Sequence, residues 1–200
     1  MSLETDDVEL VGDDTALKLA QAAIMAALIS AFAVVGSIPI PLSPAPVTLQ
    51  VLGVFLAGLL LGPWWGTGAI FLYLAAGAVG APVFAGGGAG LGTLFGYTGG
   101  YLWAYPIAAL LIGLIVHGRQ ATDAVSEVSV IRLAAALVLA TVVIYAMGVG
   151  GLLLVLDLSV EKAVVEGALV FVPGEVLKIV AAIAIVRLGE LERVISSGAR

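Results

Sequence analysis

Two charged side chains, Glu175 and Lys178, interrupt an apolar stretch near the C-terminal end of the sequence. They stand three residues apart, and residues at this spacing share one face of a helix, with Cβ atoms about 5–6 Å apart. A carboxylate accepts hydrogen bonds from N–H donors, whereas an ammonium group donates to a carboxylate or carbonyl oxygen. The spacing therefore indicates either a structural ion pair or a polar site for a small ligand, and we favour the ligand site.

The surrounding sequence is that of an integral membrane protein. Hydrophobic residues make up 62% of the 200 residues and charged residues only 11%. From Leu19 to Val116 there is no Asp, Glu, Lys or Arg. A soluble fold has too much surface to leave so long a run uncharged, whereas each ion in a bilayer core costs several kcal/mol.

Glycine and proline clusters divide the chain into about six apolar pieces. A helix that spans a membrane needs roughly 20 apolar residues, and most of the pieces approach this length. The second and third pieces are short, so they either thin the bilayer around them or form a re-entrant hairpin. We predict an all-α integral membrane protein with about six transmembrane helices. Residues 1–17 form an acidic N-terminal tail, residues 18–193 a six-helix membrane domain with an outward-facing pocket, and residues 194–200 a C-terminal tail. The expected spans are Ala16–Val35, Val47–Leu61, Thr67–Val79, Gly99–Val116, Val130–Leu152 and Ala163–Val186.

The basic residues predict the orientation. An even number of crossings places six of the eight on one side, and short loops rich in Lys and Arg face the cytoplasm. Both termini are then cytoplasmic in a multi-pass protein of the plasma membrane. The six are Lys18, Arg119, Arg132, Arg187, Arg193 and Arg200.

This orientation sends two uncharged, non-helical segments to the outer face. Residues 36–46 contain four prolines, which favour a stiff, extended course, and residues 80–92 are too rich in glycine for a stable helix. Apolar backbone of this kind is tolerated at membrane level where protein buries it or where it lines a cavity. The alternative is a pair of ordinary tight loops. Five aromatic residues at the same level are either pocket walls or an interfacial belt, namely Phe84, Phe95, Tyr97, Tyr101 and Trp103.

Several functional classes are disfavoured. The chain has no cysteine and lacks a Gly-Lys-Ser/Thr phosphate loop, so a thiolate metal site and ATP hydrolysis by that loop are excluded. The net charge of the chain is −6, so it lacks the excess of Lys and Arg that is typical of proteins that bind nucleic acid. We expect no cofactor, no metal and no enzymatic activity, and we interpret His117, the only histidine, as an interface residue.

The first apolar piece is rich in small residues, which allow helices to approach closely when they recur at four-residue spacing. Ala22 with Ala26, and Ala23 with Ala27, are candidate docking pairs for a partner protein. Packing inside the bundle explains the same pattern equally well.

Several ordered motifs resemble the BioY family, whose members are the biotin-specific substrate-binding subunits, or S components, of energy-coupling factor transporters. The resemblance runs from about residue 20 to residue 187. It departs from the family pattern at Glu175, where aspartate is usual, and at Tyr97, where proline is usual. The motifs are Pro46-Val-Thr-Leu-Gln50, Leu56-Ala-Gly-Leu-Leu-Leu-Gly62, Pro82-Val-Phe-Ala-Gly-Gly-Gly-Ala-Gly90, Thr98-Gly-Gly-Tyr-Leu102 and Pro173-Gly-Glu-Val-Leu-Lys178.

The resemblance implies an S-component-like bundle that captures biotin from outside. It also implies that alanines of the first helix dock onto a transmembrane T component, which two ATPase subunits drive, all within membrane lipid. The ligand-binding residues expected on this basis are Glu175, Lys178, Tyr101, Gly87, Gly88, Phe84 and Gln50, and the docking residues are Ala22, Ala23, Ala26 and Ala27. Alternatives are an S component for another vitamin or precursor, a membrane enzyme, and a structural membrane subunit.

Overall fold

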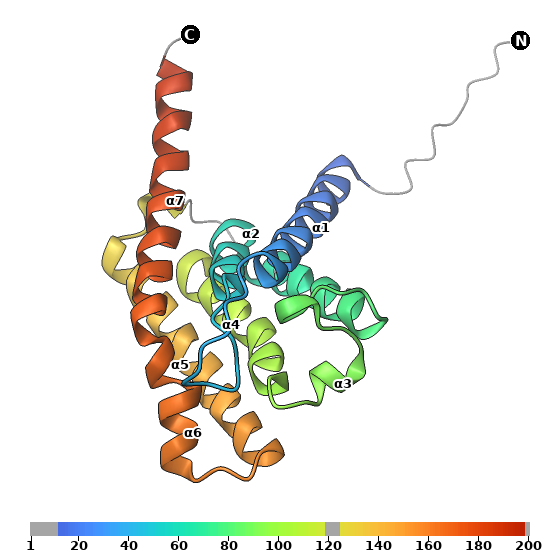
Figure 1. Ribbon diagram of the computed structural model, residues 1–200. Helices are drawn as coiled ribbons and strands as arrows, with labels where there is room; N and C mark the ends of the chain where they lie inside the picture. The colour runs from blue at the N-terminus through green and yellow to red at the C-terminus, as the bar shows by residue number, and fades with distance from the viewer. Residues whose placement is uncertain (1–11, 119–124, 199–200) are drawn as a thin grey trace, which may run out of the picture.

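The computed structural model describes residues 12–118 and 125–198, and it is built of helices that run up and down through one bundle (Figure 1). Five helical segments are long and apolar enough to cross a membrane. The predicted all-helical membrane fold is confirmed. The main helices are α1 (Asp13–Val34), α2 (Gln50–Ala78), α4 (Gly99–His117), α5 (Val130–Val155), α6 (Val160–Gly167) and α7 (Val172–Gly198).

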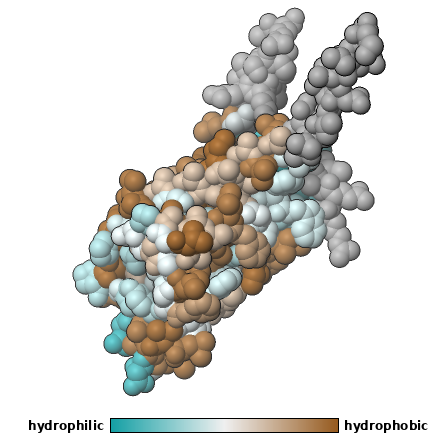
Figure 2. Space-filling view, turned by 90° about the vertical axis from the view of Figure 1, so that its right-hand side faces the viewer, coloured by the Kyte–Doolittle hydropathy of each residue, from teal (hydrophilic) through white to brown (hydrophobic). Residues whose placement is uncertain are grey.

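The outer surface has the character expected of a chain in lipid. Large apolar side chains such as Ile24, Trp64 and Leu177 are mostly exposed. Apolar colours predominate on the face that Figure 2 presents, and hydrophilic residues gather towards its lower end. This surface is stable only against hydrocarbon, because a soluble protein does not leave so much apolar area open to water.

The second and third expected spans are joined directly in α2, without a loop between them. Gly62 has φ 73° and ψ −173°, a left-handed conformation that favours glycine, and Pro63 begins the second half of the helix. The halves fold back on each other, since a Cβ on Gly66 would lie 2.5 Å from the Ala57 carbonyl oxygen. The first half, residues 50–61, is about 18 Å long at 1.5 Å per residue. It is thus shorter than a bilayer core.

The last expected span is also interrupted. Helix α6 ends at Gly167, the single turn η3 (Leu169–Phe171) follows, and α7 then begins at Val172. Pro173 lies in the first turn of α7, where its missing N–H costs no helical hydrogen bond, but it prevents the preceding residues from continuing as one helix. The break places Glu175 in the first turn of a new helix inside the apolar region.

The helix directions bring the two unusual loops to one end of the bundle. Helix α1 begins, and α7 ends, at the opposite end from these loops (Figure 1). Lys18, Arg132 and Arg187 lie towards that opposite end, and the Arg187 guanidinium donates a hydrogen bond to the carbonyl of Val128, just before α5. Of the expected tails, residues 1–11 lie outside the described residues. Helix α1 starts before residue 18, and α7 continues past residue 193.

Helix α1 presents its alanines to two different surroundings. Ala22 and Ala26 are buried in the core of the bundle, on the face of α1 that packs against α2. Ala23 and Ala27 are exposed on the other face. Packing inside the bundle, the alternative explanation of the small-residue pattern, accounts for the positions of Ala22 and Ala26. Of the four candidates, Ala23 and Ala27 are open to a partner.

Candidate functional site

A cavity of about 620 Å³ lies at the loop end of the bundle. Its size falls within the roughly 300–1,000 Å³ of typical small-molecule sites. Residues of α2, α4, α5 and α7, of the short turns α3 (Leu91–Leu94) and η3, and of both unusual loops line it, so both loops form part of the cavity wall. The lining includes Ser37, Ile40, Thr48, Gln50, Phe84, Gly86, Gly88, Thr93, Tyr97, Thr98, Tyr101, Tyr105, Ile144, Tyr145, Phe171, Glu175 and Lys178.

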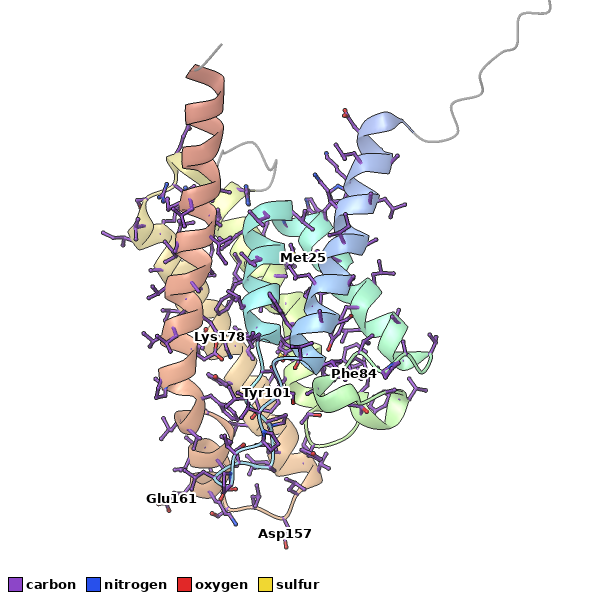
Figure 3. All side chains as sticks on the ribbon, turned by 45° about the horizontal axis from the view of Figure 1, so that its top comes forward. Met25, Phe84, Tyr101, Asp157, Glu161 and Lys178 are labelled. Carbon is purple, nitrogen blue, oxygen red and sulfur yellow. The ribbon has the colours of Figure 1, made fainter. Side chains whose placement is uncertain are left out.

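Glu175 and Lys178 form a buried ion pair in the wall of this cavity. The Lys178 ammonium donates to one carboxylate oxygen, with an Nζ–Oε1 distance of 2.5 Å, and the residues are only 4% and 7% exposed. Figure 3 shows Lys178 inside the bundle, far from Asp157 and Glu161 at its lower tip. An isolated charge in this environment is costly. Each of the two residues therefore keeps its charge because the opposite charge lies beside it.

The second carboxylate oxygen is in a different situation. Glu175 Oε2 is buried and meets no donor at ordinary hydrogen-bond geometry among the described residues, although the Tyr145 hydroxyl interacts with this carboxylate. The first turn of α7 also stabilises the carboxylate, because the N-terminal end of a helix carries partial positive charge. The carboxylate is therefore an acceptor in the wall of the cavity with hydrogen-bonding capacity beyond its bond to Lys178.

Tyr101 supplies a fixed aromatic wall. Its hydroxyl donates to the carbonyl oxygen of Gly167 at 2.7 Å, which ties α4 to the end of α6. Its ring fills a notch on α5, where a Cβ on Gly148 would lie 2.1 Å from Cε1 of the ring. The absence of a side chain at Gly148 therefore sets the position of Tyr101.

Gln50 is held in place at the start of α2. Its amide nitrogen donates to the Tyr73 hydroxyl at 2.6 Å, and its carbonyl oxygen accepts a hydrogen bond from the Thr48 hydroxyl at 3.0 Å. Phe84 lies beside this group, edge-on to the Tyr73 ring at a centroid distance of 5.5 Å. These contacts form a rigid polar and aromatic corner of the cavity.

The glycine-rich loop approaches the cavity with its backbone. Gly86 and Gly87 have φ values of 65° and 83°, which make a tight turn closed by a hydrogen bond from the Phe84 N–H to the Gly88 carbonyl oxygen. Gly86 and Gly88 line the cavity, whereas Gly87 does not. The other six expected ligand-binding residues all line it.

The aromatic residues divide between the two predicted roles. Tyr97 lines the cavity with Phe84 and Tyr101, whereas Phe95 and Trp103 lie outside its lining and pair with each other at 6.3 Å. Three further lining residues, Tyr105, Tyr145 and Phe171, were not predicted. The sequence signal that could have identified the two tyrosines is their position inside apolar helices, because a buried hydroxyl needs a hydrogen-bond partner.

A lysine and the only histidine also have partners in the structure. Lys162 and Glu166, which stand four residues apart on α6, form an ion pair with an Nζ–Oε1 distance of 3.8 Å. His117 is buried, with Nε2 2.7 Å from the Leu59 carbonyl oxygen, so it connects the end of α4 to α2. It lies on another part of the molecule from the residues that line the cavity.

Comparison with known proteins places this architecture in a family. The model of the BioY family matches residues 5–196. The chain belongs to the BioY family. It is similar to the "Biotin transporter BioY" of Thermotoga maritima, with 39% identity over 84% of this chain and 96% of that protein. It is also similar to the Rhizobium etli protein of the same name, with 36% identity over 80% of this chain and 86% of the relative.

The fold of this BioY protein also matches a solved structure. That structure is the 2.1 Å crystal structure of "the S-component for biotin from an ECF-type ABC transporter". The TM-score is 0.81 at 28% identity, over 90% of this chain and 94% of that one. The expected S-component-like bundle is confirmed.

The notch at Gly148 generates a prediction for this BioY protein. Gly148→Ala should place a methyl group against the Tyr101 ring, which cannot move without losing its bond to Gly167. Overpacking of this kind costs about 1–3 kcal/mol, so the melting temperature of the purified protein in detergent should fall by several degrees.

Gly150→Ala is the matched control on the same helix, because nothing lies within 4 Å of a Cβ at that position. It should leave the melting temperature unchanged or raise it, since alanine favours helix over glycine. Equal melting temperatures for the two variants would contradict the role assigned to the notch.

Proposed function

We propose that this chain is a biotin-binding S component of an energy-coupling factor transporter, which captures biotin from outside the cell. The observation that carries the proposal is the buried Glu175–Lys178 pair in the wall of a cavity of ligand size. Membership of the BioY family supports transport over the alternatives of a membrane enzyme or a structural subunit.

The chemistry of biotin suits this end of the cavity. Its ureido group presents N–H donors on either side of a carbonyl oxygen. Glu175 Oε2 would accept one N–H, and Lys178, held beside the same carboxylate, would donate to the carbonyl oxygen. The carboxylate of biotin is a poor fit here because Glu175 would repel it.

The other end of biotin, a pentanoate chain, would then point towards the loops. That part of the lining carries Ser37, Thr93, Thr98 and Tyr97, together with the backbone of the glycine-rich turn. Hydroxyl and backbone N–H groups are suitable donors to a carboxylate. Phe84, Tyr101 and Phe171 offer apolar surface for the rings and the methylene chain.

For coupling, we infer that the exposed face of α1 contacts a transmembrane T component. Ala23 and Ala27 are small and exposed, four residues apart, and exposed Ala20 and Ala31 extend the same stripe. Small residues at this spacing let two helices pack closely within a membrane. Two ATPase subunits would supply the energy, because the sequence has no phosphate loop of its own.

A second candidate is an S component for another vitamin or precursor. The cavity walls are largely aromatic and apolar, which suits several flat ring systems. Calorimetry with a panel of vitamins separates the candidates, and tighter binding of thiamine or riboflavin than of biotin would overturn our choice.

Lys178→Ala should weaken biotin binding strongly. The change removes a charge-assisted hydrogen bond worth roughly 1.5–3 kcal/mol, or about 10- to 150-fold in the dissociation constant. Titration calorimetry on the purified protein measures the loss. Association with the partner subunits should survive, because α7 is not the proposed docking helix.

Lys162→Ala is the control for removing a lysine. Its ammonium lies in an exposed pair with Glu166, and such surface pairs contribute about 0–1 kcal/mol. Biotin affinity should therefore stay within twofold of the unmodified protein. Normal binding by Lys178→Ala would show that the ion pair has only a structural role.

Replacement of Ala23 and Ala27 by Trp should separate binding from uptake. Neither residue lines the cavity, so biotin affinity should be retained, whereas two bulky rings on the exposed face should prevent close helix packing. Cells that carry the complete transporter should lose biotin uptake, and the T component should no longer co-purify.

The matched control is Ala135→Trp, at an exposed alanine on α5. It adds the same bulk to another helix and should preserve uptake. If Ala135→Trp abolished uptake and the α1 variant did not, the docking face would be on the wrong helix.

The proposed orientation has both termini in the cytoplasm and the cavity open to the outside. A reporter that is active only in the cytoplasm should work when fused after Arg200 and fail when inserted near Gly88. The opposite pattern would place the cavity on the cytoplasmic side and overturn the direction of capture.

A further inference from the structure

The charged groups of the cavity are confined to one place in its wall. Among the described residues that line it, Glu175 and Lys178 are the only charged ones, and they are paired with each other. The lining residues from Ser37 to Tyr105 all belong to the run 19–116, which contains no Asp, Glu, Lys, Arg or His. The part of the cavity that the two loops form is therefore polar without any basic side chain.

The charged part and the loop part also differ in burial. Glu175 and Lys178 are nearly inaccessible, and Figure 3 shows Lys178 inside the bundle. The loop part carries hydroxyl groups, here called the loop-end hydroxyls, on side chains that are half-buried or exposed. A ligand group beside them keeps some contact with water, whereas a group beside the ion pair loses its hydration. The loop-end hydroxyls are those of Ser37, Tyr97 and Thr98.

The loop-end hydroxyls cannot select for a negative charge. A hydroxyl both donates and accepts a hydrogen bond, so it suits a carboxylate, an amide carbonyl and an amide N–H alike. A basic side chain would favour the carboxylate, because a charge-assisted hydrogen bond is about twice as strong as a neutral one. The one basic lining residue, Lys178, is already neutralised by Glu175 at an Nζ–Oε1 distance of 2.5 Å.

The ion pair, in contrast, sets strict requirements on its ligand. Glu175 accepts hydrogen bonds only, and Lys178 donates only. Both are desolvated, so a ligand group of the wrong kind would leave a charged group without compensation. The protein therefore reads the ring end of biotin closely and its carboxyl end loosely.

We propose that this cavity selects its ligand by the ureido ring and not by the carboxylate, so that uncharged amides of biotin are ligands alongside biotin itself. This inference rests on the proposed function and deepens it, because it names a wider substrate class for the same site. The amide group takes the place of the carboxylate at the loop-end hydroxyls, and the ring keeps its contacts with Glu175 and Lys178.

The first test is titration calorimetry of the full chain with biotin and with biotinamide, in which a carboxamide replaces the carboxylate. The two dissociation constants should agree within about fivefold, the upper range for a charge interaction at an exposed site. The control ligand is biotin methylated at one ureido nitrogen, which loses an N–H at the buried end. It should bind about 10- to 150-fold more weakly than biotin, as expected for a lost hydrogen bond to a charged group.

The second test adds the missing charge. Thr93 lines the loop part of the cavity, and its hydroxyl donates only to the Ala89 carbonyl nearby in the chain, at 3.0 Å. In Thr93→Lys, the ratio of the dissociation constants for biotinamide and biotin should rise to about tenfold or more, because only biotin gains a charge-assisted bond. Thr93→Met, of similar length but uncharged, should keep the ratio of the unmodified protein. The ratio is taken within one variant, so a general loss of affinity does not affect it.

Biotinamide binding more than about tenfold weaker than biotin in the unmodified protein would overturn the proposal, since such a gap requires a charged partner for the carboxylate. Equal binding of biotin and its N-methylated form would overturn it as well, because the ring would then not be read. Failure of the unmodified protein to bind biotin would refute the proposed function instead.

Discussion

The structure depends on burying one ion pair inside an otherwise apolar helix bundle. Glu175 and Lys178 are nearly inaccessible, and removal of either partner would leave a charge without compensation in a medium of low dielectric constant. The break at η3 and the new helix start at Val172 make the burial tolerable, because they bring the positive end of α7 to the carboxylate. The pair lies in the wall of a cavity that is lined otherwise by aromatic rings, apolar side chains and small hydroxyl and glycine residues.

Glycine and proline determine the shape of that cavity. Gly62 and Pro63 fold α2 back on itself, and the short first half of the helix begins at Gln50 beside the cavity. Gly148 makes room for Tyr101, and the Gly86–Gly87 turn lets backbone replace side chains along one wall. Gly148 lets a ring approach closer than a Cβ allows, whereas Gly62, Gly86 and Gly87 adopt positive φ values that favour glycine. The loops that look unstructured by composition are therefore ordered parts of the cavity wall.

Binding and the proposed coupling occupy different parts of the molecule. The cavity lies among α4, α5, α7 and the two loops, whereas the exposed alanine stripe lies on the outer side of α1. Helix α1 nevertheless packs against α2 and against the single turn η1 (Ala85–Gly87) of the glycine-rich loop. A change at the docking face thus has a short structural path to the cavity wall.

The sequence by itself determined the membrane setting, the helical class and the importance of Glu175 and Lys178. These conclusions follow from local composition and spacing. A charge-free run of nearly 100 residues indicates a membrane, and two ionisable groups three residues apart share a helix face, whatever the long-range contacts. The family motifs added the expectation of biotin, and six of the seven expected ligand-binding residues line the cavity.

Only the tertiary structure decided which side of each helix faces inward. Four alanines of α1 are equivalent in sequence, but the packing of α2 buries Ala22 and Ala26 and leaves Ala23 and Ala27 open. Nothing local distinguishes Tyr145 from Trp103, yet one reaches the cavity and the other packs beside Phe95. In a lipid-exposed bundle both faces of a helix are apolar, so the hydrophobic periodicity that orients helices in water is lost, and the choice falls to contacts between segments far apart in the chain.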